Sequence, residues 1–334
     1  GAVNGNGGLT KSGSAALVLE GANTYTGATN VAAGTLALAG SGSIAQSSGV
    51  NLQASGTVFD ISATNSGATV NSLSGVEGSQ INLGAKTLTV NSISDSLYEG
   101  DVVGTGGVNK QGSNTSVLNR AQSYTGATNI SGGVLALSGA GSIAQSSGVS
   151  LSASGAALDI SATTAGATVN NLSGVAGSQV NLGAQTLSAN SNADSAYAGD
   201  VNGTGGLTKN GSATLTLEGA NAYTGATNVA AGTLALAGSG SVAQSSGVNL
   251  AAAGAALDIS ATTAGATVNN LSGVSGSQVN LGAQSLTVNS AANAVFAGNV
   301  SGTGDLIKSG ASTLVLEGTN TYTGATNVAA GTLA

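Results

Sequence analysis

The chain has 334 residues, of which 41% are apolar, 2% are aromatic and 6% are charged, with 55 glycines and a net charge of −7. Its six basic residues cannot form the positive footprint that a phosphate backbone requires, which excludes nucleic acid as an expected partner. No apolar run reaches the length of about 18 residues that would cross a bilayer, so the chain is not expected to span a membrane.

The composition predicts a thin hydrophobic core. A thick interior is normally filled by large aromatic side chains, whereas Val, Leu, Ile and Ala fill only a narrow space between close backbone layers. The scarcity of charge leaves Ser, Thr, Asn, Gln and Gly for the surface. Disorder is not expected, because low hydrophobicity and high net charge are both missing.

One unit of 99 residues is repeated along the chain. Tyr-Thr-Gly-Ala-Thr-Asn begins at Tyr25, Tyr124, Tyr223 and Tyr322. A long period without insertions predicts stacked modules. We therefore expect one continuous β-solenoid over 1–334, with repeats at 1–99, 100–198 and 199–297 and a partial repeat at 298–334.

Short strands with alternating apolar residues are predicted within each repeat. Gly-rich and Ser-rich segments, such as 237–240 and 272–276, separate them and supply the conformations that tight corners need. No stretch sustains the apolar spacing of a helix, so essentially no α-helix is expected. In the third repeat the predicted strands lie at 215–217, 234–236, 257–259 and 279–281.

A second period of about 20 residues appears inside the repeat. Two columns of similar residues each divide 99 residues into five steps, which predicts five turns per repeat and about 17 turns in the chain. An all-β, parallel β-helix with turns of about 20 residues is the expected fold. The columns are Thr10, Asn30, Asn51, Asn71, Asn91 and Asn109, and Leu215, Leu234, Leu257, Val279, Phe296 and Leu314.

The sequence offers little to catalysis. His and Cys are absent, which removes the commonest general base and the thiolate nucleophile. Asp60, Asp159 and Asp258 recur, but strand alternation places them outward and the repeats hold them apart. Calcium solenoids carry Asp after their glycines, whereas Leu207 follows Gly206 here. No catalytic, cofactor-binding or metal-binding residue is assigned, and no enzyme is expected.

Three further groups of side chains have predicted roles. Lys11 and its equivalents are expected to pair with the Glu of Leu-Glu-Gly, at Glu20, Glu218 and Glu317. The repeated aromatic residues are expected to fill corners of the fold. Charges are densest between Glu77 and Arg120, so a patch specific for a partner is expected there, if one exists.

The block from Gly205 to Leu234 resembles the autotransporter-associated β-strand repeat, also called the passenger-associated transport repeat. It recurs from Gly7, Gly106 and Gly304, with a poorer match at 119–123. The resemblance implies a right-handed β-helix in a bacterial passenger that is exported through a C-terminal outer-membrane barrel lying outside this chain. It also implies an extracellular location, anchored or released, and a role in secretion and passenger folding.

Three functions are compatible with this sequence. A stalk or adhesin segment in surface attachment is the first, with multivalent contact to cell-surface or matrix components through motifs about 24 Å apart. A self-assembling filament or biofilm-matrix protein, whose partners are other copies of itself, is the alternative. A scaffold within an enzyme or toxin passenger is the third, and it requires a non-repeating domain that these residues do not contain.

Overall fold

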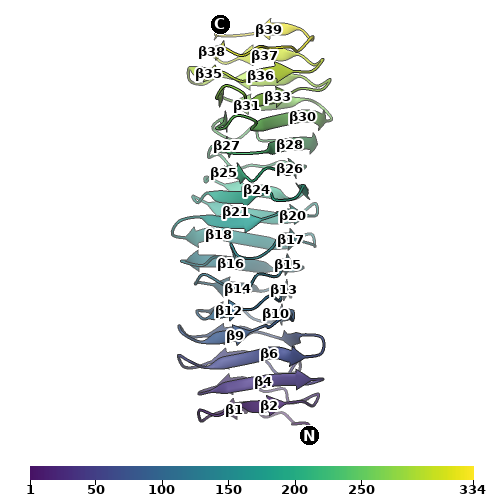
Figure 1. The fold of residues 1–334 in the computed structure, drawn as a ribbon, viewed down its shortest axis with the longest axis vertical. Coiled ribbons are helices and arrows are strands. Elements are labelled where there is room, and N and C mark those ends of the chain that lie inside the picture. The colour runs from purple at the N-terminus through teal and green to yellow at the C-terminus, as the bar shows by residue number, and fades with distance from the viewer. The chain divides into compact units, whose positions relative to one another are not determined.

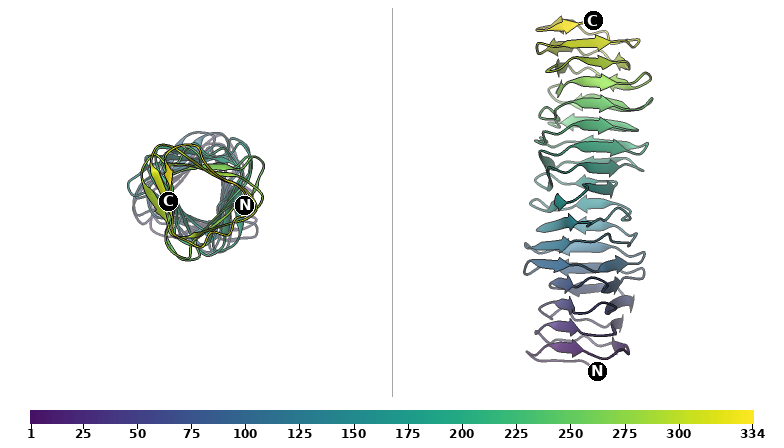
Figure 2. Two further views of the ribbon diagram at one scale, coloured as in Figure 1. Left: turned by 90° about the horizontal axis from the view of Figure 1, so that it is seen from above. Right: turned by 90° about the vertical axis from the view of Figure 1, so that its left-hand side faces the viewer.

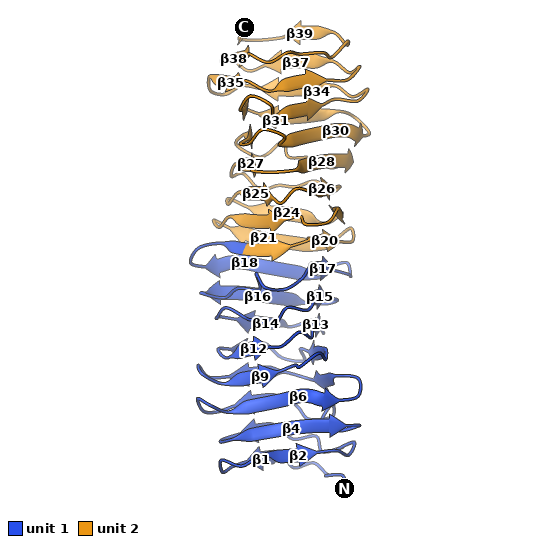
Figure 3. Cartoon of the chain, viewed as in Figure 1, with its two compact units in different colours: residues 1–167 blue, residues 168–334 orange.

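A computed structural model describes residues 1–334 and contains strands but no helix, so no helical segment could cross a membrane (Figure 1). The chain divides into two compact units, residues 1–167 and 168–334 (Figure 3). Each unit is a parallel β-solenoid, and the chain makes about 16 turns. The predicted all-β solenoid is confirmed. Its continuity between the two units stays a prediction.

Three parallel ladders form unit 1, and in each of them every strand pairs with a strand of the adjacent turn (Figure 2). The first ladder contains β1 (Leu9–Lys11), β3 (Thr29–Val31), β5 (Val50–Leu52), β8 (Leu73–Gly75), β11 (Ser96–Tyr98), β14 (Thr115–Leu118), β16 (Val134–Gly139) and β18 (Ala157–Thr163). The second contains β2 (Leu17–Leu19), β4 (Thr35–Gly40), β6 (Val58–Thr64), β9 (Gln80–Asn82) and β12 (Asp101–Val103). The third contains β7 (Ala68–Val70), β10 (Leu88–Asn91), β13 (Val108–Gln111), β15 (Thr128–Ile130) and β17 (Val149–Leu151).

Unit 2 is built in the same way, and β19 (Ala167–Asn170) includes the residues at which the chain is divided. Its longest ladder contains β22 (Leu187–Asn190), β25 (Leu207–Asn210), β27 (Thr227–Val229), β29 (Val248–Leu250), β32 (Leu271–Gly273), β35 (Ala294–Phe296), β38 (Thr313–Leu316) and β40 (Thr332–Leu333). A second contains β20 (Ser173–Gly174), β23 (Ser195–Tyr197), β26 (Thr214–Leu217), β28 (Thr233–Gly238), β30 (Ala256–Thr262), β33 (Gln278–Asn280) and β36 (Asn299–Ser301). The shorter ladders contain β31 (Ala266–Asn269), β34 (Leu286–Asn289), β37 (Leu306–Ser309) and β39 (Thr326–Val328), and β21 (Gln179–Gly183) with β24 (Asp200–Gly203).

Alternation along each strand builds the core. In β28, Leu234 and Leu236 are fully buried, whereas Thr233 and Ala235, which alternate with them, point outward. Each strand stacks its inward residues on those of the adjacent turn, so the core is a narrow column of aliphatic side chains. The predicted column is confirmed from Leu215 through Leu234 and Leu257 to Val279.

The predicted column is wrong beyond Val279. This residue pairs with Val300, whereas Phe296 lies in the other long ladder of unit 2, paired with Gly273 and Leu316. Phe296 resembles the column because it is also an inward apolar residue. An inward apolar residue marks the core but does not reveal which ladder it belongs to.

The prediction of five turns per repeat is also wrong. In unit 1, the ladder that starts at Leu9 passes through Thr29, Val50 and Leu73, and its next two turns place Ser96 and Ser116 in the same column. Val108, the equivalent of Leu9 in the next repeat, lies in the third ladder, between those two turns. One repeat therefore completes about four and two-thirds turns of about 21 residues each, which gives about 16 turns rather than about 17.

Equivalent motifs consequently lie on different sides of each unit. In unit 1, β3 belongs to the first ladder and β15, one repeat later, to the third. In unit 2, β27 and β39 differ in the same way. Five whole turns per repeat would have placed identical motifs on the same side, but successive copies are rotated by about a third of a turn.

The predicted Asn column exists only in short pieces. Asn30 pairs with Asn51 as expected, but Asn51 then pairs with Ser74, 23 residues later. Asn71 and Asn91 lie on another face, where the Nδ2 of Asn91 donates to the Oδ1 of Asn71 at 3.3 Å. Stacked amides therefore join neighbouring turns in pairs.

The core of unit 1 has a packing defect at Ser116. Leu17, Leu215 and Leu314 occupy this position in the other repeats, and a cavity of about 20 Å³ adjoins Ser116. The Oγ of Ser116 lies 2.6 Å from the Oγ of Ser92.

We expect Ser116→Leu to raise the free energy of unfolding by about 1–2 kcal/mol, because it fills the cavity. The lost hydrogen bond should cost little. Ser191 and Ser290 are equivalent to Ser92 and lie opposite a leucine, and their hydroxyl groups lack a hydrogen-bond partner. Urea denaturation followed by circular dichroism measures the change. Ser116→Ala, which removes the same hydrogen bond without filling the cavity, is the control. Equal stability of the two variants contradicts the prediction.

Candidate functional site

A buried lysine in each repeat binds three backbone carbonyl groups. Lys209 ends the inward side of β25, where Leu207 also points inward, and it is fully buried. Its Nζ donates to the carbonyl oxygens of Asn210, Gly211 and Ala231 at 2.8, 2.8 and 3.1 Å. One carbonyl belongs to the following turn, so the ammonium group joins two turns. Lys11, Lys110 and Lys308 repeat the arrangement.

The predicted pairing of these lysines with glutamate is wrong. The only ion pair in the structure joins Arg120 and Glu77. Leu-Thr-Lys follows the alternation of the strand and directs Lys209 to the same side as Leu207. The glycine at position 211, with a φ of 77°, turns the chain back so that its carbonyl oxygen reaches the ammonium group.

The Tyr-Thr-Gly-Ala-Thr motif builds a second buried polar cluster. The hydroxyl of Tyr223 lies 2.6 Å from the Oγ1 of Thr227, which donates to the Oγ of Ser245 at 2.9 Å. Ser245 donates in turn to the carbonyl oxygen of Gly225 at 2.9 Å. The cluster joins two turns and is fully satisfied, which is the condition under which buried polar groups stabilise a fold. The first two repeats contain the same cluster.

The glycines of the motif allow neighbouring turns to approach closely. The amide of Gly225 donates to the carbonyl oxygen of Gly205 at 3.1 Å. A Cβ atom on Gly205 would lie 1.7 Å from the carbonyl oxygen of Gln185, and one on Gly225 would lie 2.4 Å from the carbonyl carbon of Gly205. No side chain fits at either position.

The buried groups predict a maximum of stability in mildly alkaline solution. Burial lowers the pKa of Lys110 and of Lys209 to about 8, with nearby Asp95 and Asp194 acting in the opposite direction. Burial raises the pKa of Tyr223 and raises that of Tyr124 to about 12, each partly offset by the hydrogen bond to threonine.

Between pH 8 and the ordinary lysine value of 10.5, the unfolded chain binds more protons than the folded chain, so the lysines make stability rise with pH. Above pH 10 the unfolded tyrosines lose their protons first, so the tyrosines make stability fall as pH rises further. We expect the thermal midpoint to peak near pH 9–10. Calorimetry between pH 6 and 12 measures it. A midpoint that falls steadily from pH 7 contradicts the assignment.

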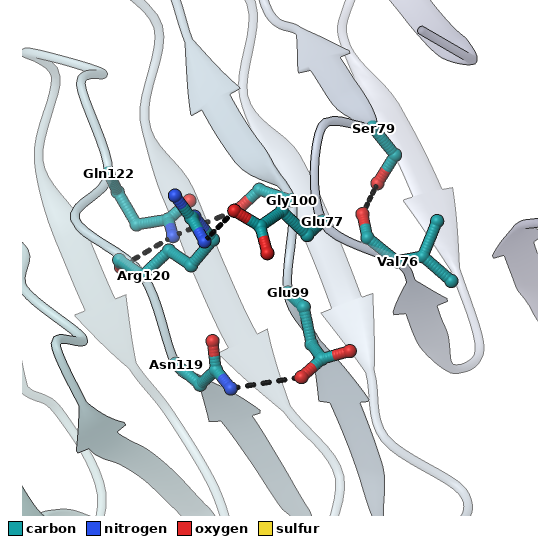
Figure 4. A network of polar contacts seen from close by, with 8 residues as sticks. All are labelled: Val76, Glu77, Ser79, Glu99, Gly100, Asn119, Arg120 and Gln122. Carbon is teal, nitrogen blue, oxygen red and sulfur yellow. Dashed lines mark hydrogen bonds and ion pairs between the residues drawn. The ribbon is translucent and has the colours of Figure 1, made fainter. Parts of the chain in front are cut away.

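The charged patch predicted between Glu77 and Arg120 is an open cleft of about 540 Å³ in unit 1. The Nη1 of Arg120 lies 2.6 Å from the Oε1 of Glu77, with both side chains exposed (Figure 4). The Nδ2 of Asn119 donates to the Oε1 of Glu99 at 3.0 Å. An exposed ion pair contributes roughly 0–1 kcal/mol to the free energy of unfolding, so this pair adds little to the stability of the fold. The selectivity of the charged cleft for a partner stays a prediction.

Other acidic and aromatic residues are used by the fold. The Oδ1 of Asp60 accepts a hydrogen bond from the amide of Ser62, and its Oδ2 accepts one from the Nδ2 of Asn82 on the next turn. No three acidic side chains gather at one place in the structure. Tyr98 is buried in the interior, on β11, where it packs against Gly75 of the preceding turn.

Comparison with known proteins agrees with these repeated clusters. The family model described as passenger-associated-transport-repeat matches residues 9–38, 108–137, 207–236 and 306–334, about a third of the chain. Each match begins at the strand that carries the buried lysine and includes the tyrosine motif.

A curated relative is the adhesin BmaC autotransporter of Brucella suis biovar 1 (strain 1330). It is 38% identical over 138 residues, which are 40% of this chain and 4% of the relative. The comparison with solved structures gave no significant match. The four matched segments, each with its buried lysine, show that this chain contains four passenger-associated-transport-repeats.

Proposed function

We propose that the chain is a structural, non-catalytic segment of a bacterial autotransporter passenger, which acts as a stalk or adhesin in surface attachment. The four matched repeats carry this proposal, because each one contributes a lysine that connects neighbouring turns, and the first three also contribute a tyrosine cluster that does so. The ammonium and hydroxyl groups of these clusters make their hydrogen bonds within the chain. They are therefore suited to build a scaffold and not to bind a substrate.

The relative named as an adhesin supports the role in attachment. The proposed location is the bacterial cell surface or the medium, after export through an outer-membrane barrel encoded outside these residues. The surface of Ser, Thr, Asn and Gly and the low charge suit many weak contacts with cell-surface or matrix components. The rotation of successive repeats distributes those contacts around each unit.

Surface display tests the proposed function. The chain, fused to an outer-membrane barrel and displayed on a non-adherent bacterium, should increase attachment to a coated surface several-fold over cells that display the barrel alone. A solenoid of similar length from an unrelated protein is the control for reach. Attachment no greater than that of this control contradicts the adhesin role. Sedimentation of the purified chain at high concentration distinguishes an adhesin that remains monomeric from the alternative, a self-assembling filament.

A further inference from the structure

Unit 1 contains a groove lined mainly by hydroxyl and backbone groups. It lies where the chain between β4 and β5 forms no strand, so that β7 on the following turn pairs only with β10. Its volume is about 380 Å³, within the range of small-molecule sites. The lining contains Gly40, Ser41, Gly42, Ser43, Asn65, Ser66, Gly67, Ala68, Thr69, Thr87 and Thr89. We call it the hydroxyl groove.

The free edge of β7 lines this groove. The amide of Ala68 donates to the carbonyl oxygen of Thr87 at 3.1 Å, which directs the backbone groups of Ala68 toward β10. Consecutive residues of a strand direct their N–H and C=O groups to opposite sides, so those of Thr69 point away from β10 and toward the groove. The groove therefore offers a backbone donor and acceptor beside the hydroxyl of Thr89. The Oγ of Ser41 donates to the carbonyl oxygen of Glu20, so it is left as an acceptor.

The same groove occurs in unit 2, formed by residues 198 positions later. Its volume is about 460 Å³, and its lining includes Ser239, Thr267 and Thr287, which are equivalent to Ser41, Thr69 and Thr89. Here β31 occupies the place of β7 and pairs only with β34. Neither groove contains a charged or an aromatic side chain. The groove is thus a product of the repeat, present in both units.

We propose that the hydroxyl groove binds a short segment of a neutral polysaccharide. An occupant must carry both donors and acceptors of hydrogen bonds, and it must be uncharged because the groove has no charge to pair with it. Sugar hydroxyls meet both conditions. A peptide strand fits less well, since β-strand addition needs a run of free backbone groups and β7 directs only those of Thr69 outward.

The inference deepens the proposed function, because it assigns the contact surface of the adhesin. Each groove lacks an aromatic ring for stacking, so a single contact is weak. Two grooves on one chain raise the affinity for a polymer that reaches both, by making the second contact intramolecular. The inference therefore predicts binding to long neutral polysaccharides and little binding to their monosaccharides.

Affinity electrophoresis through gels that contain dextran, laminarin or galactomannan tests the proposal. The wild-type chain should be retarded in at least one of these gels. The double variant Thr89→Lys with Thr287→Lys, which projects a long side chain into each groove, should lose at least tenfold in affinity. Thr10→Lys with Thr208→Lys, on outward strand positions that line neither groove, is the matched control and should be retarded like wild type.

A second double variant, Ser41→Arg with Ser239→Arg, obstructs the grooves from exposed loop positions and should reproduce the loss if the first variant folds poorly. Equal retardation of groove and control variants overturns the proposal, as does retardation only by acidic alginate or the absence of retardation in every gel. Displayed on cells, the groove variants separate the two ideas. Full attachment by these variants contradicts the role of the groove but not the adhesin role. No attachment by the wild-type chain contradicts the adhesin role itself.

Discussion

Replacing Gly205 with alanine is expected to lower the free energy of unfolding by about 3–5 kcal/mol, one of the two largest effects that we predict for this chain. The added Cβ would lie 1.7 Å from the carbonyl oxygen of Gln185 on the preceding turn. The obstacle is backbone, which cannot rotate away as a side chain does. Relief requires that the two turns separate, and this breaks the hydrogen bonds between them, among them the one that the amide of Gly205 donates to the carbonyl oxygen of Gly183.

The chain contains a matched control for this substitution. Gly7 occupies the same position of the motif, but an added Cβ there meets no atom within 4 Å. Gly7→Ala should therefore change the stability by less than about 0.5 kcal/mol, as is usual for surface substitutions. Urea denaturation of both variants measures the difference, and hydrogen exchange locates it in the turns around β25. Similar losses in both variants would show that glycine is needed for its own flexibility and not for the close approach of turns.

The fold class was predictable because its causes are local. Alternation in segments such as Leu234-Ala-Leu236 determines the inward residues, and Gly-rich and Ser-rich corners end each strand. The number of turns per repeat was not predictable in the same way. It depends on how many residues each corner uses, and the step between paired residues varies from 19 for Leu17 and Leu36 to 24 for Gly40 and Thr64.

Identity of residue type misled the assignment of columns. Asn51 and Asn71 are the same residue about one turn apart, yet Asn51 pairs with Ser74 and Asn71 lies on another face. An outward Asn suits every face of a solenoid, so its recurrence does not identify a face. Only the pairing of strands along the whole repeat shows that successive copies are rotated.

The lysine site was missed although a sequence signal existed. Charge suggested a surface pair with glutamate, but alternation places Lys209 on the inward side with Leu207, and a glycine follows two residues later. An inward lysine needs several acceptors to compensate for its burial. A corner that turns back over the strand supplies them as carbonyl groups, which no pattern of side chains reveals. The charged cleft was located because charges are densest between Glu77 and Arg120 in a chain of which only 6% is charged.

Replacing Lys209 with methionine is expected to lower the free energy of unfolding by about 2–4 kcal/mol at pH 7. Methionine preserves most of the buried stem but donates no hydrogen bond, so the carbonyl groups of Asn210, Gly211 and Ala231 lose their shared donor. Removal of a buried charge offsets part of the loss. Three hydrogen bonds to a charged group, each contributing roughly 1.5–3 kcal/mol, should outweigh that gain.

Two features separate this outcome from a general effect of losing a lysine. Lys86→Met is the control, because the Nζ of Lys86 makes a single exposed contact, with the carbonyl oxygen of Asn65 at 3.3 Å, and its loss should cost little. The rise in stability from pH 8 upward should also shrink in the Lys209 variant, since its pKa near 8 contributes to that rise. Unchanged or increased stability of Lys209→Met at pH 7 would mean that the burial of charge outweighs the three hydrogen bonds. The lysine of each repeat would then require a reason other than stability, and guidance of the turns during folding, measured as the refolding rate of the variant, would be the next property to examine.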